Sequence, residues 1–542
     1  MIVAELVGHV LGELGVGHAF GVVGSGNFHV TNALRAAGVD FTAARHEGGA
    51  ATMADAFARM SGRPAVLSVH QGCGLTNALT GITEAAKSRT PLIVLAADTG
   101  GAAVRSNFRI DQDSLVTAVG AVAERVHSPE SALADTVRAY RTAVQQRRTV
   151  VLNLPLDVQA EKAPDTGPVP TVAPLAAPRP AAAAVAALAE LIAAARRPVF
   201  IAGRGARAAR DELRGLAAAS GALLATSAVA SGLFHDDEWS LGISGGFATP
   251  LAAELISGAD LVVGWGCALN MWTTRHGVLI GPDTRVAQVD LDADAIGAHR
   301  PVHLGVLGDV AATATEVRAA LPGIRTAYRT DAVRAALAAR GRWRDEPYDD
   351  LSGAEGIDPR TLSIALDDVL PVERVVAVDS GNFMGYPSVY LDVPDEFGYC
   401  LTQGFQSIGL GLATAIGAAL ARPDRLTVAA LGDGGALMSA AELETVARLA
   451  IVMVVVVYDD RGYGAEFHHF STADHGCVRF PETDIAAIGR GFGFEAVTVR
   501  APSDLAGVAR WVAGPRTSPL LVDAKIASDG GSWWLAEAFR GH

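Results

Sequence analysis

Cysteine is scarce in this chain of 542 residues, and the cysteines it has are far apart. The four, Cys73, Cys267, Cys400 and Cys477, have no spacing typical of metal ligands. The first residues, from Met1 to Leu6, show no basic segment followed by an apolar core, which is the pattern of a secretory signal. We therefore expect a cytoplasmic protein whose thiols are reduced.

Long apolar runs and an excess of positive charge are also absent. The longest unbroken apolar run, Leu449 to Tyr458, is far shorter than the roughly 20 residues that a membrane-spanning helix needs. Asp and Glu number 58 against 44 Lys and Arg, so sequence-independent binding to nucleic acid is not expected. Neither a membrane nor a nucleic acid is an expected partner.

The length suggests about three domains, because a single core rarely grows this large. Short apolar strands alternate with helical patterns in residues 1–162, 185–322 and 357–542. A Pro- and Ala-rich linker covers 163–184, and a charged linker, ten residues of which have a helical pattern, covers 323–355. This rhythm predicts an α/β protein with three doubly wound domains and mainly parallel sheets.

The most informative stretch lies in the third domain. A short apolar strand from Leu426 to Leu431 leads into Gly432-Asp433-Gly434, and a second buried strand from Ile451 to Val457 leads into Asp459-Asp460. One helix, 439–448, is expected between the two strands. Adjacent parallel strands end side by side, so an exposed Asp433 and Asp460 can converge on one magnesium ion. The alternative is an ordinary turn with solvated aspartates.

Polar residues also follow the strands of the first domain, where ligands of open sheets bind. Ser25 follows the strand 19–23, Glu47 follows 39–44, and His70 and Gln71 follow 65–69. A helix cap is the alternative interpretation of Ser25, and a satisfied strand-end histidine is that of His70. Both alternatives stay open.

Two further motifs have structural interpretations. Gly203-Arg204-Gly205 resembles the start of a dinucleotide-binding loop but lacks the third glycine at the required spacing, which favours a structural turn. Trp533-Trp534 is interpreted as part of a packed carboxyl-terminal helix rather than as the cap of a pocket.

Two motifs together carry a family resemblance. Gly432-Asp433-Gly434 with Asp459-Asp460, and Arg45-His46-Glu47 followed by the segment 50–64, resemble signatures of the thiamine diphosphate enzymes of the acetolactate synthase, benzoylformate decarboxylase and pyruvate decarboxylase group. The similarity covers all three expected domains, which would be pyrimidine-binding, central and diphosphate-binding. It implies thiamine diphosphate and Mg²⁺ as cofactors, and a homodimer or homotetramer with active sites between subunits.

The resemblance also implies a role for each site residue. Glu47 would hydrogen-bond the aminopyrimidine of the cofactor, and Ser25, His70 and Gln71 would act at the substrate. Asp433, Asp460 and the carbonyl of Gly462 would bind the metal. The other expected cofactor-binding residues are Asn382, Phe383, Gln406, Ile408, Gly434, Gly435 and Tyr463.

The family resemblance implies an enzyme that decarboxylates a 2-oxo acid. The resulting enamine would be protonated, or coupled to an aldehyde or ketone acceptor, and the sequence does not decide between these outcomes. One alternative is a flavin-containing acetolactate synthase. The loop 70–74 and the segment Met271 to His276 both argue against it, because they differ from the sequences expected there. The other alternative is a cofactor-binding scaffold without catalysis.

One residue departs from the family pattern. Asp460 stands where the family usually has asparagine, so the site would carry two carboxylates. The extra charge repels the diphosphate by about 4 kcal/mol at 4 Å and an effective dielectric near 20, but it also attracts the metal. The neighbouring Arg461 is expected to offset part of it.

Overall fold

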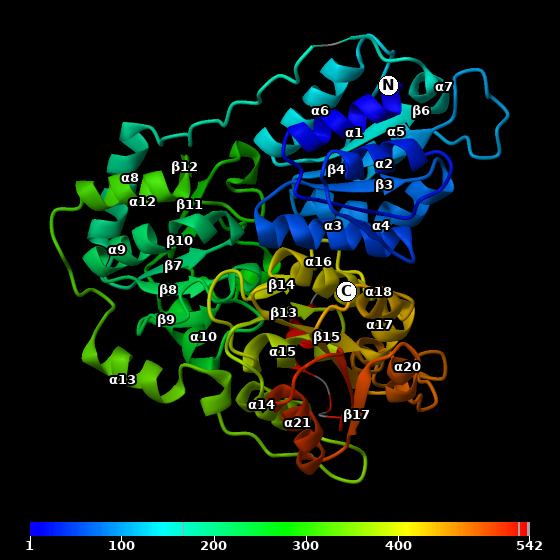
Figure 1. Cartoon of the computed structure of the whole chain (residues 1–542). Coiled ribbons are helices and arrows are strands. Elements are labelled where there is room, and N and C mark those ends of the chain that lie inside the picture. Colours follow the sequence, from blue (N-terminus) through cyan, green and yellow to red (C-terminus); the bar gives the residue numbers. More distant parts are fainter. Residues whose placement is uncertain (166, 529, 531, 539–542) are drawn as a thin grey trace.

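Three six-stranded sheets, each with helices on its faces, make up the chain (Figure 1). The structure is a computed structural model that describes all residues except 166, 529, 531 and 539–542. The expected class of three α/β domains is confirmed, and every pairing between the named strands is parallel. The end of the expected third domain, 539–542, lies outside the described residues.

The first sheet has the strand order β2-β1-β3-β4-β6-β5. Its strands are β1 (His18–Gly21), β2 (Phe41–Ala43), β3 (Ala65–Val69), β4 (Leu92–Asp98), β5 (Val122–Arg125) and β6 (Thr149–Pro155). Its helices are α1 (Val3–Glu13), α2 (Phe28–Ala36), α3 (Glu47–Ser61), α4 (Cys73–Lys87), α5 (Gln112–Ala118), α6 (Ala132–Gln145) and α7 (Leu156–Ala160).

The second sheet has the order β12-β11-β10-β7-β8-β9. In the charged segment expected as a linker, the helical pattern forms α13, whose Leu337 packs with Tyr328 in a core cluster of this domain. The strands are β7 (Pro198–Ala202), β8 (Leu223–Thr226), β9 (Ser240–Ile243), β10 (Leu261–Trp265), β11 (Arg285–Asp290) and β12 (Leu304–Leu307). The helices are α8 (Ala182–Ala194), α9 (Arg210–Ser220), α10 (Pro250–Ser257), α11 (Met271–Thr274), α12 (Val310–Ala320) and α13 (Asp331–Arg340).

The third sheet has the order β14-β13-β15-β16-β18-β17. The single helix expected over 439–448 is wrong, because the chain forms one helix that starts at Asp433 and a second that starts at Glu442. The strands are β13 (Arg374–Val378), β14 (Tyr399–Leu401), β15 (Leu426–Gly432), β16 (Met453–Asp459), β17 (Glu495–Val499) and β18 (Leu520–Lys525). The helices are α14 (Pro359–Val369), α15 (Gly385–Tyr390), α16 (Gly411–Ala421), α17 (Asp433–Met438), α18 (Glu442–Arg448), α19 (Gly464–His469), α20 (Ile485–Gly491), α21 (Ala506–Ala513) and α22 (Trp533–Ala538).

The first and third domains share one core. Helix α3 lies against α16 between the two sheets, as Figure 1 shows. A Cβ atom added to Gly417 would lie 2.2 Å from the carbonyl oxygen of Met53, so glycine lets the two helices approach closely. One cluster of buried side chains, including Met53, Phe57, Leu412 and Ile416, runs through both domains.

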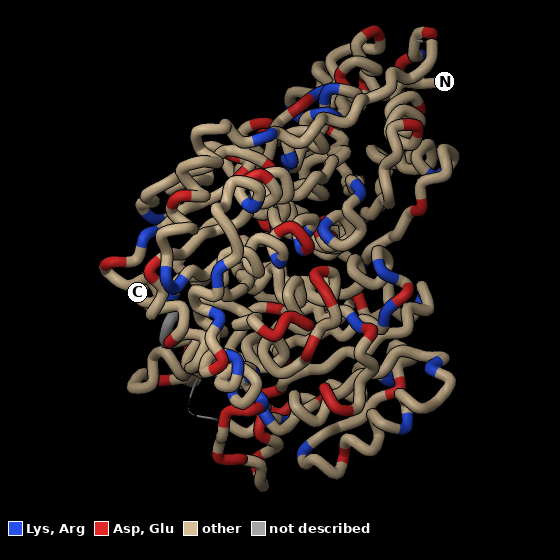
Figure 2. Tube along the Cα trace, turned by 90° about the vertical axis from the view of Figure 1, so that its left-hand side faces the viewer, with Lys and Arg blue, Asp and Glu red and all other residues tan. Residues whose placement is uncertain are grey.

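Charged residues of both signs are spread along the chain. In the view of Figure 2, Lys and Arg are interspersed with Asp and Glu. Within the described part of the chain, every helix is too short or too polar to cross a bilayer.

Candidate active site

Two carboxylates meet at the ends of the paired strands β15 and β16. Asp433 begins α17 directly after β15, and Asp460 follows the last residue of β16. Asp433 is only 6% exposed, so the expectation of an exposed aspartate is wrong. The ring of Tyr463 lies against the adjacent Gly434, on which a Cβ atom would lie 2.6 Å from it.

Burial and like charge raise the pKa of both carboxylates. Burial and the neighbouring Asp459 raise the pKa of Asp433 to about 7. Burial and the charge of Asp433 raise the pKa of Asp460 well above its ordinary value. Two buried carboxylates that oppose each other's ionisation favour a bound cation between them.

The donor set fits magnesium better than a transition metal. The described residues contain no cluster of three or more His, Cys, Asp or Glu side chains that could enclose a metal. Magnesium needs few protein oxygens, because water and phosphate oxygens complete its octahedron. The pair Asp433 and Asp460 therefore suits a magnesium ion that carries a diphosphate.

The adjacent Asp459 has a different environment from Asp460. Its carboxylate pairs with Lys525, which also pairs with Asp523 at 3.0 Å. The side chain of Arg461 pairs with Glu355 at 3.2 Å. Arg461 thus has a partner other than Asp460, and its expected effect on the charge of Asp460 stays a prediction.

Asn382 is held from three sides. Its side chain hydrogen-bonds Asp460, and its Oδ1 accepts a hydrogen bond of 2.9 Å from Ser532. The indole of Trp534 donates to its carbonyl oxygen at 2.8 Å. Trp534 is fully buried, as expected for a packed carboxyl-terminal helix. Next to Asn382, the ring of Phe383 stacks on that of Tyr458, with centroids 5.3 Å apart.

Sequence reasoning missed Asp379, which fixes the loop that carries Ile408. Its carboxylate accepts hydrogen bonds from the backbone N–H of Gly409 at 3.0 Å and of Leu410 at 3.2 Å. A Cβ atom on Gly435 would lie 2.3 Å from Asp379 Oδ2, so this approach needs a glycine. Burial raises the pKa of Asp379 to about 6 despite its N–H donors.

The remaining expected cofactor residues lie at the start of α17, in the loop before α16 and in the loop between β16 and α19. The backbone N–H of Gly462 donates to Asp433, which places Gly462 beside the pair, although its expected carbonyl ligand stays a prediction. Gln406 has a φ of 62°, a left-handed conformation that non-glycine residues rarely adopt. Such local strain is common at ligand sites.

The first domain gathers a second group of polar side chains. Ser25 Oγ lies 3.4 Å from His70 Nε2, and the His70 ring packs edge-on against Phe108. Gln71 is 4% exposed, and its Oε1 atom is buried without a hydrogen-bond partner. Helix α2 is preceded by Asn27 at its N-cap, so Ser25 does not cap this helix.

Glu47 is the first residue of α3, beside this group. Its Oε2 atom accepts a hydrogen bond of 3.0 Å from Asn77, a partner that sequence reasoning missed. Among the described residues, no hydrogen bond or ion pair joins Ser25, Glu47 or His70 to Asp433 or Asp460. A single chain thus presents two separate groups of site residues.

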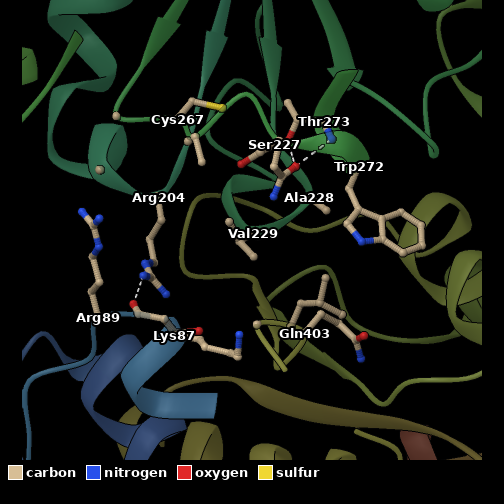
Figure 3. Close-up of a pocket in the computed structure, with 18 of the residues that line it drawn as sticks. Lys87, Arg89, Arg204, Ser227, Ala228, Val229, Cys267, Trp272, Thr273 and Gln403 are labelled. Carbon is tan, nitrogen blue, oxygen red and sulfur yellow. Dashed lines mark hydrogen bonds between the residues drawn. The ribbon is translucent and has the colours of Figure 1, made fainter. Parts of the chain in front are cut away.

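A cavity of about 570 Å³ lies where the three domains meet. Its walls include Gly203, Arg204 and Gly205, so the glycine pair interpreted as a structural turn borders an open space. In Figure 3, Arg204 points across the cavity toward Lys87 and hydrogen-bonds the carbonyl of Ser88. Burial, with the charges of Arg59 and Arg207, lowers the pKa of Arg204 to about 9.

Three α/β domains with a buried carboxylate pair at the strand ends of the third are the arrangement of a cofactor-dependent enzyme. Comparison with protein families specifies the cofactor. The chain matches the N-terminal TPP binding domain (1–115), the central domain (185–317) and the C-terminal TPP binding domain (379–524) of thiamine pyrophosphate enzymes. The chain belongs to the thiamine pyrophosphate enzyme family.

Curated relatives span nearly the whole chain. A sulfoacetaldehyde acetyltransferase of Castellaniella defragrans is 29% identical over 90% of this chain and 86% of its own length. A probable 2-ketoarginine decarboxylase of Pseudomonas aeruginosa is 29% identical over 92% and 88%. An acetolactate synthase of Bacillus subtilis is 27% identical over 96% and 93%. The chain is thus similar to enzymes with several different activities.

We predict that Asp460→Asn keeps cofactor binding and stabilises the cofactor-free protein at pH 8. The pKa of Asp433 in the folded chain, about 7, lies above the value near 3.9 of an unfolded aspartate. The folded state therefore binds more protons, and its stability falls as pH rises through this window. Removing one of two opposed charges should reduce that fall by ~1 kcal/mol or more.

Urea unfolding at pH 5 and pH 8, without magnesium, measures this difference. Asp331→Asn, at the exposed start of α13, is the matched control and should change neither value. Loss of thiamine diphosphate binding by Asp460→Asn in a magnesium titration would contradict the proposed ligand role of Asp460.

Proposed function

We propose that this chain is a thiamine diphosphate- and magnesium-dependent decarboxylase or carboligase of a 2-oxo acid. The observation that carries the proposal is the buried pair Asp433 and Asp460, whose raised pKa values favour a bound cation, within a TPP binding domain. After carbon dioxide leaves, the product carbon is either protonated or joined to an aldehyde or ketone.

The residues of the third domain would hold the cofactor. Asp433, Asp460 and the carbonyl of Gly462 would bind Mg²⁺, and the backbone N–H groups of Gly434 and Gly435 would meet the diphosphate. Thiamine diphosphate, when bound, supplies an electron sink for decarboxylation. The other contacts would come from Asn382, Phe383, Tyr463, Ile408 and the main chain of Gln406.

Glu47 would exchange a proton with the aminopyrimidine of the cofactor. Its position suits this role because it begins a buried helix and its Oε2 atom is oriented by Asn77. A carboxyl group fixed by one hydrogen bond keeps its other oxygen available for a ligand.

His70, Ser25 and Gln71 would act on the substrate. His70 Nδ1 lies 3.2 Å from the backbone oxygen of Gln71, which can only accept, so Nδ1 carries the hydrogen in the neutral ring. Nε2 then faces Ser25 as an acceptor, and its protonated form can deliver a proton to the product carbon. The unpartnered Oε1 of Gln71 is available to a substrate donor.

The proposal includes both outcomes, protonation of the product carbon and its ligation to a second carbonyl compound. The names of the relatives include an acetyltransferase, a decarboxylase and a synthase, so they support both outcomes. The group around His70, rather than the metal carboxylates, would decide the outcome, because in this proposal it would face the substrate.

We also propose a homodimer, or a dimer of dimers, with each active site between subunits. Two facts support it: the two groups of site residues do not contact each other within one chain, and apolar side chains are exposed beside both. Phe28 and Phe108 are 52% and 44% exposed beside the first group, and Met438 is 56% exposed beside the second.

A flavin-containing acetolactate synthase is the second candidate, and the cavity favours it. The cavity has room for a sizeable ligand, and its basic side chains, Arg59, Lys87, Arg89, Arg147 and Arg204, suit an anionic group. Against this candidate, Trp272 and Thr273 line the cavity, and they belong to the segment Met271 to His276, which stands in place of the expected flavin-contacting sequence.

We predict that Glu47→Gln lowers turnover of the accepted 2-oxo acid by at least about 100-fold, because the amide cannot exchange the proton. Carbon dioxide release and coupling products from a panel of 2-oxo acids, with thiamine diphosphate and magnesium, measure this loss. If the native protein releases no more carbon dioxide than Glu47→Gln for any acid, the scaffold alternative is favoured.

Mixing two inactive variants should restore activity if the site is shared between subunits. A Glu47→Gln chain paired with an Asp433→Ala chain has one intact site, because each supplies what the other lacks. Co-expression should give about a quarter of native activity, since half of the dimers are mixed and each has one working site. Activity no higher than that of either variant alone would show that both groups serve the same chain's cofactor.

The flavin alternative predicts a yellow protein that forms acetolactate from pyruvate. Arg204→Ala should then lose flavin on gel filtration, because it removes a cation from the cavity. Arg318→Ala, an exposed arginine on α12 of the same domain, should retain it. A colourless protein that neither takes up added flavin nor forms acetolactate would eliminate this candidate.

A further inference from the structure

A buried carboxylate of the third domain holds the turn that precedes Glu47. Glu442 begins α18 and is 3% exposed. Its Oε1 atom accepts hydrogen bonds from the backbone N–H of Arg45 at 3.0 Å and of His46 at 3.1 Å. Its Oε2 atom accepts a bond of 2.6 Å from Thr445. Both oxygens of Glu442 are therefore used, and neither is left for solvent.

Two further residues of α18 contact the same turn. Glu444 forms an ion pair with Arg45, and Arg448 donates to the carbonyl of Ala43 at the end of β2. A Cβ atom on Gly49 would lie 2.6 Å from Glu442 Oε1, so there is no room for the turn to shift toward α18. The connection between β2 and α3 is thus held by a helix of another domain.

A second buried carboxylate crosses the same interface, in this case from the first domain to a loop of the third. Glu84 of α4 is fully buried, and it accepts hydrogen bonds from the backbone N–H of Gly404 at 3.0 Å and of Phe405 at 2.6 Å. These two residues directly precede Gln406. Although burial opposes the charge, the Arg59 guanidinium and the two N–H donors hold the pKa of Glu84 below its usual range.

We infer that Glu442 is a positioning residue for Glu47, and that Glu84 does the same for the loop with Gln406 and Ile408. The inference rests on the proposed function of Glu47. A carboxylate that accepts from two successive N–H groups fixes the orientation of the peptide between them. His46 is the N-cap of α3 and Glu47 its first residue, so a change in the turn displaces the Glu47 carboxyl directly.

Loss of the Glu442 carboxylate should affect the reactivity of the bound cofactor more than its binding. Without Glu442 the N–H groups of Arg45 and His46 lose a buried acceptor, and the turn has to move to regain partners. A displacement of about 1 Å of a reacting group can cost as much as 100-fold in rate. The residues that hold the metal and the diphosphate, by contrast, keep all their contacts.

Three variants test the inference in the full-length protein with bound thiamine diphosphate and magnesium. Glu442→Ala removes the acceptor, whereas Glu442→Gln keeps one acceptor oxygen. Glu495→Gln, an exposed glutamate on β17, is the control. The main readout is the exchange rate of the C2 proton of the bound cofactor, measured by NMR after quenched flow into D₂O. The second is amide hydrogen exchange of residues 43–50.

We expect C2 exchange to slow about 10-fold or more in Glu442→Ala. The thiamine diphosphate Kd should stay within about threefold of that of the native protein, because the metal and diphosphate contacts are intact. Glu442→Gln should recover most of the rate, and Glu495→Gln should match the native protein. Amide exchange in 43–50 should rise only in Glu442→Ala.

Native C2 exchange in Glu442→Ala would overturn the inference. It would also be overturned if exchange and cofactor affinity fell together, equally in Glu442→Ala and Glu442→Gln, since Glu442 would then be a merely structural residue. If the native protein itself does not accelerate C2 exchange over the free cofactor, the proposed function fails. The amide exchange of 43–50 then still decides whether Glu442 fixes the turn.

Discussion

The close packing of α3 on α16 is the contact on which the rest of the structure depends. Small residues on both helices let them approach until Gly417 touches the backbone of Met53. This contact joins two sheets into one core and brings α18 beside the turn before Glu47, and α4 beside the loop before Gln406. Each domain can therefore supply a buried carboxylate to the loop of the other.

Charge balance distinguishes the carboxylates of the third domain. Asp459 pairs with Lys525 within the sheet, so it is part of the scaffold. Burial raises the pKa of both Asp433 and Asp460; the charge of Asp459 adds to the shift of Asp433, and the charges of Asp433 and Asp459 add to that of Asp460. Buried carboxylates with raised pKa values are common at functional sites.

The sequence predicted the fold class and the central strands well, because strands such as β3 and β16 are continuous apolar runs buried on both faces. It missed β5, β8, β9, β12, β14 and β17, which have short or mixed patterns and which, apart from β8, lie at sheet edges. Motifs located Asp433, Asp460 and Glu47. The roles of Asp379, Asn77 and Glu442 were not identified from the sequence. Each depends on a partner 30 to 397 residues away, which no local pattern reveals.

The structure shows which neighbouring residues could compensate for the charge of Asp460. The nearby cation that could have compensated for its charge, Arg461, is engaged by Glu355. Asn382 gives Asp460 a hydrogen bond, but it has no charge to offer. Under the proposed function, compensation would come from the bound metal, so a second carboxylate would make the site more dependent on magnesium than an asparagine would.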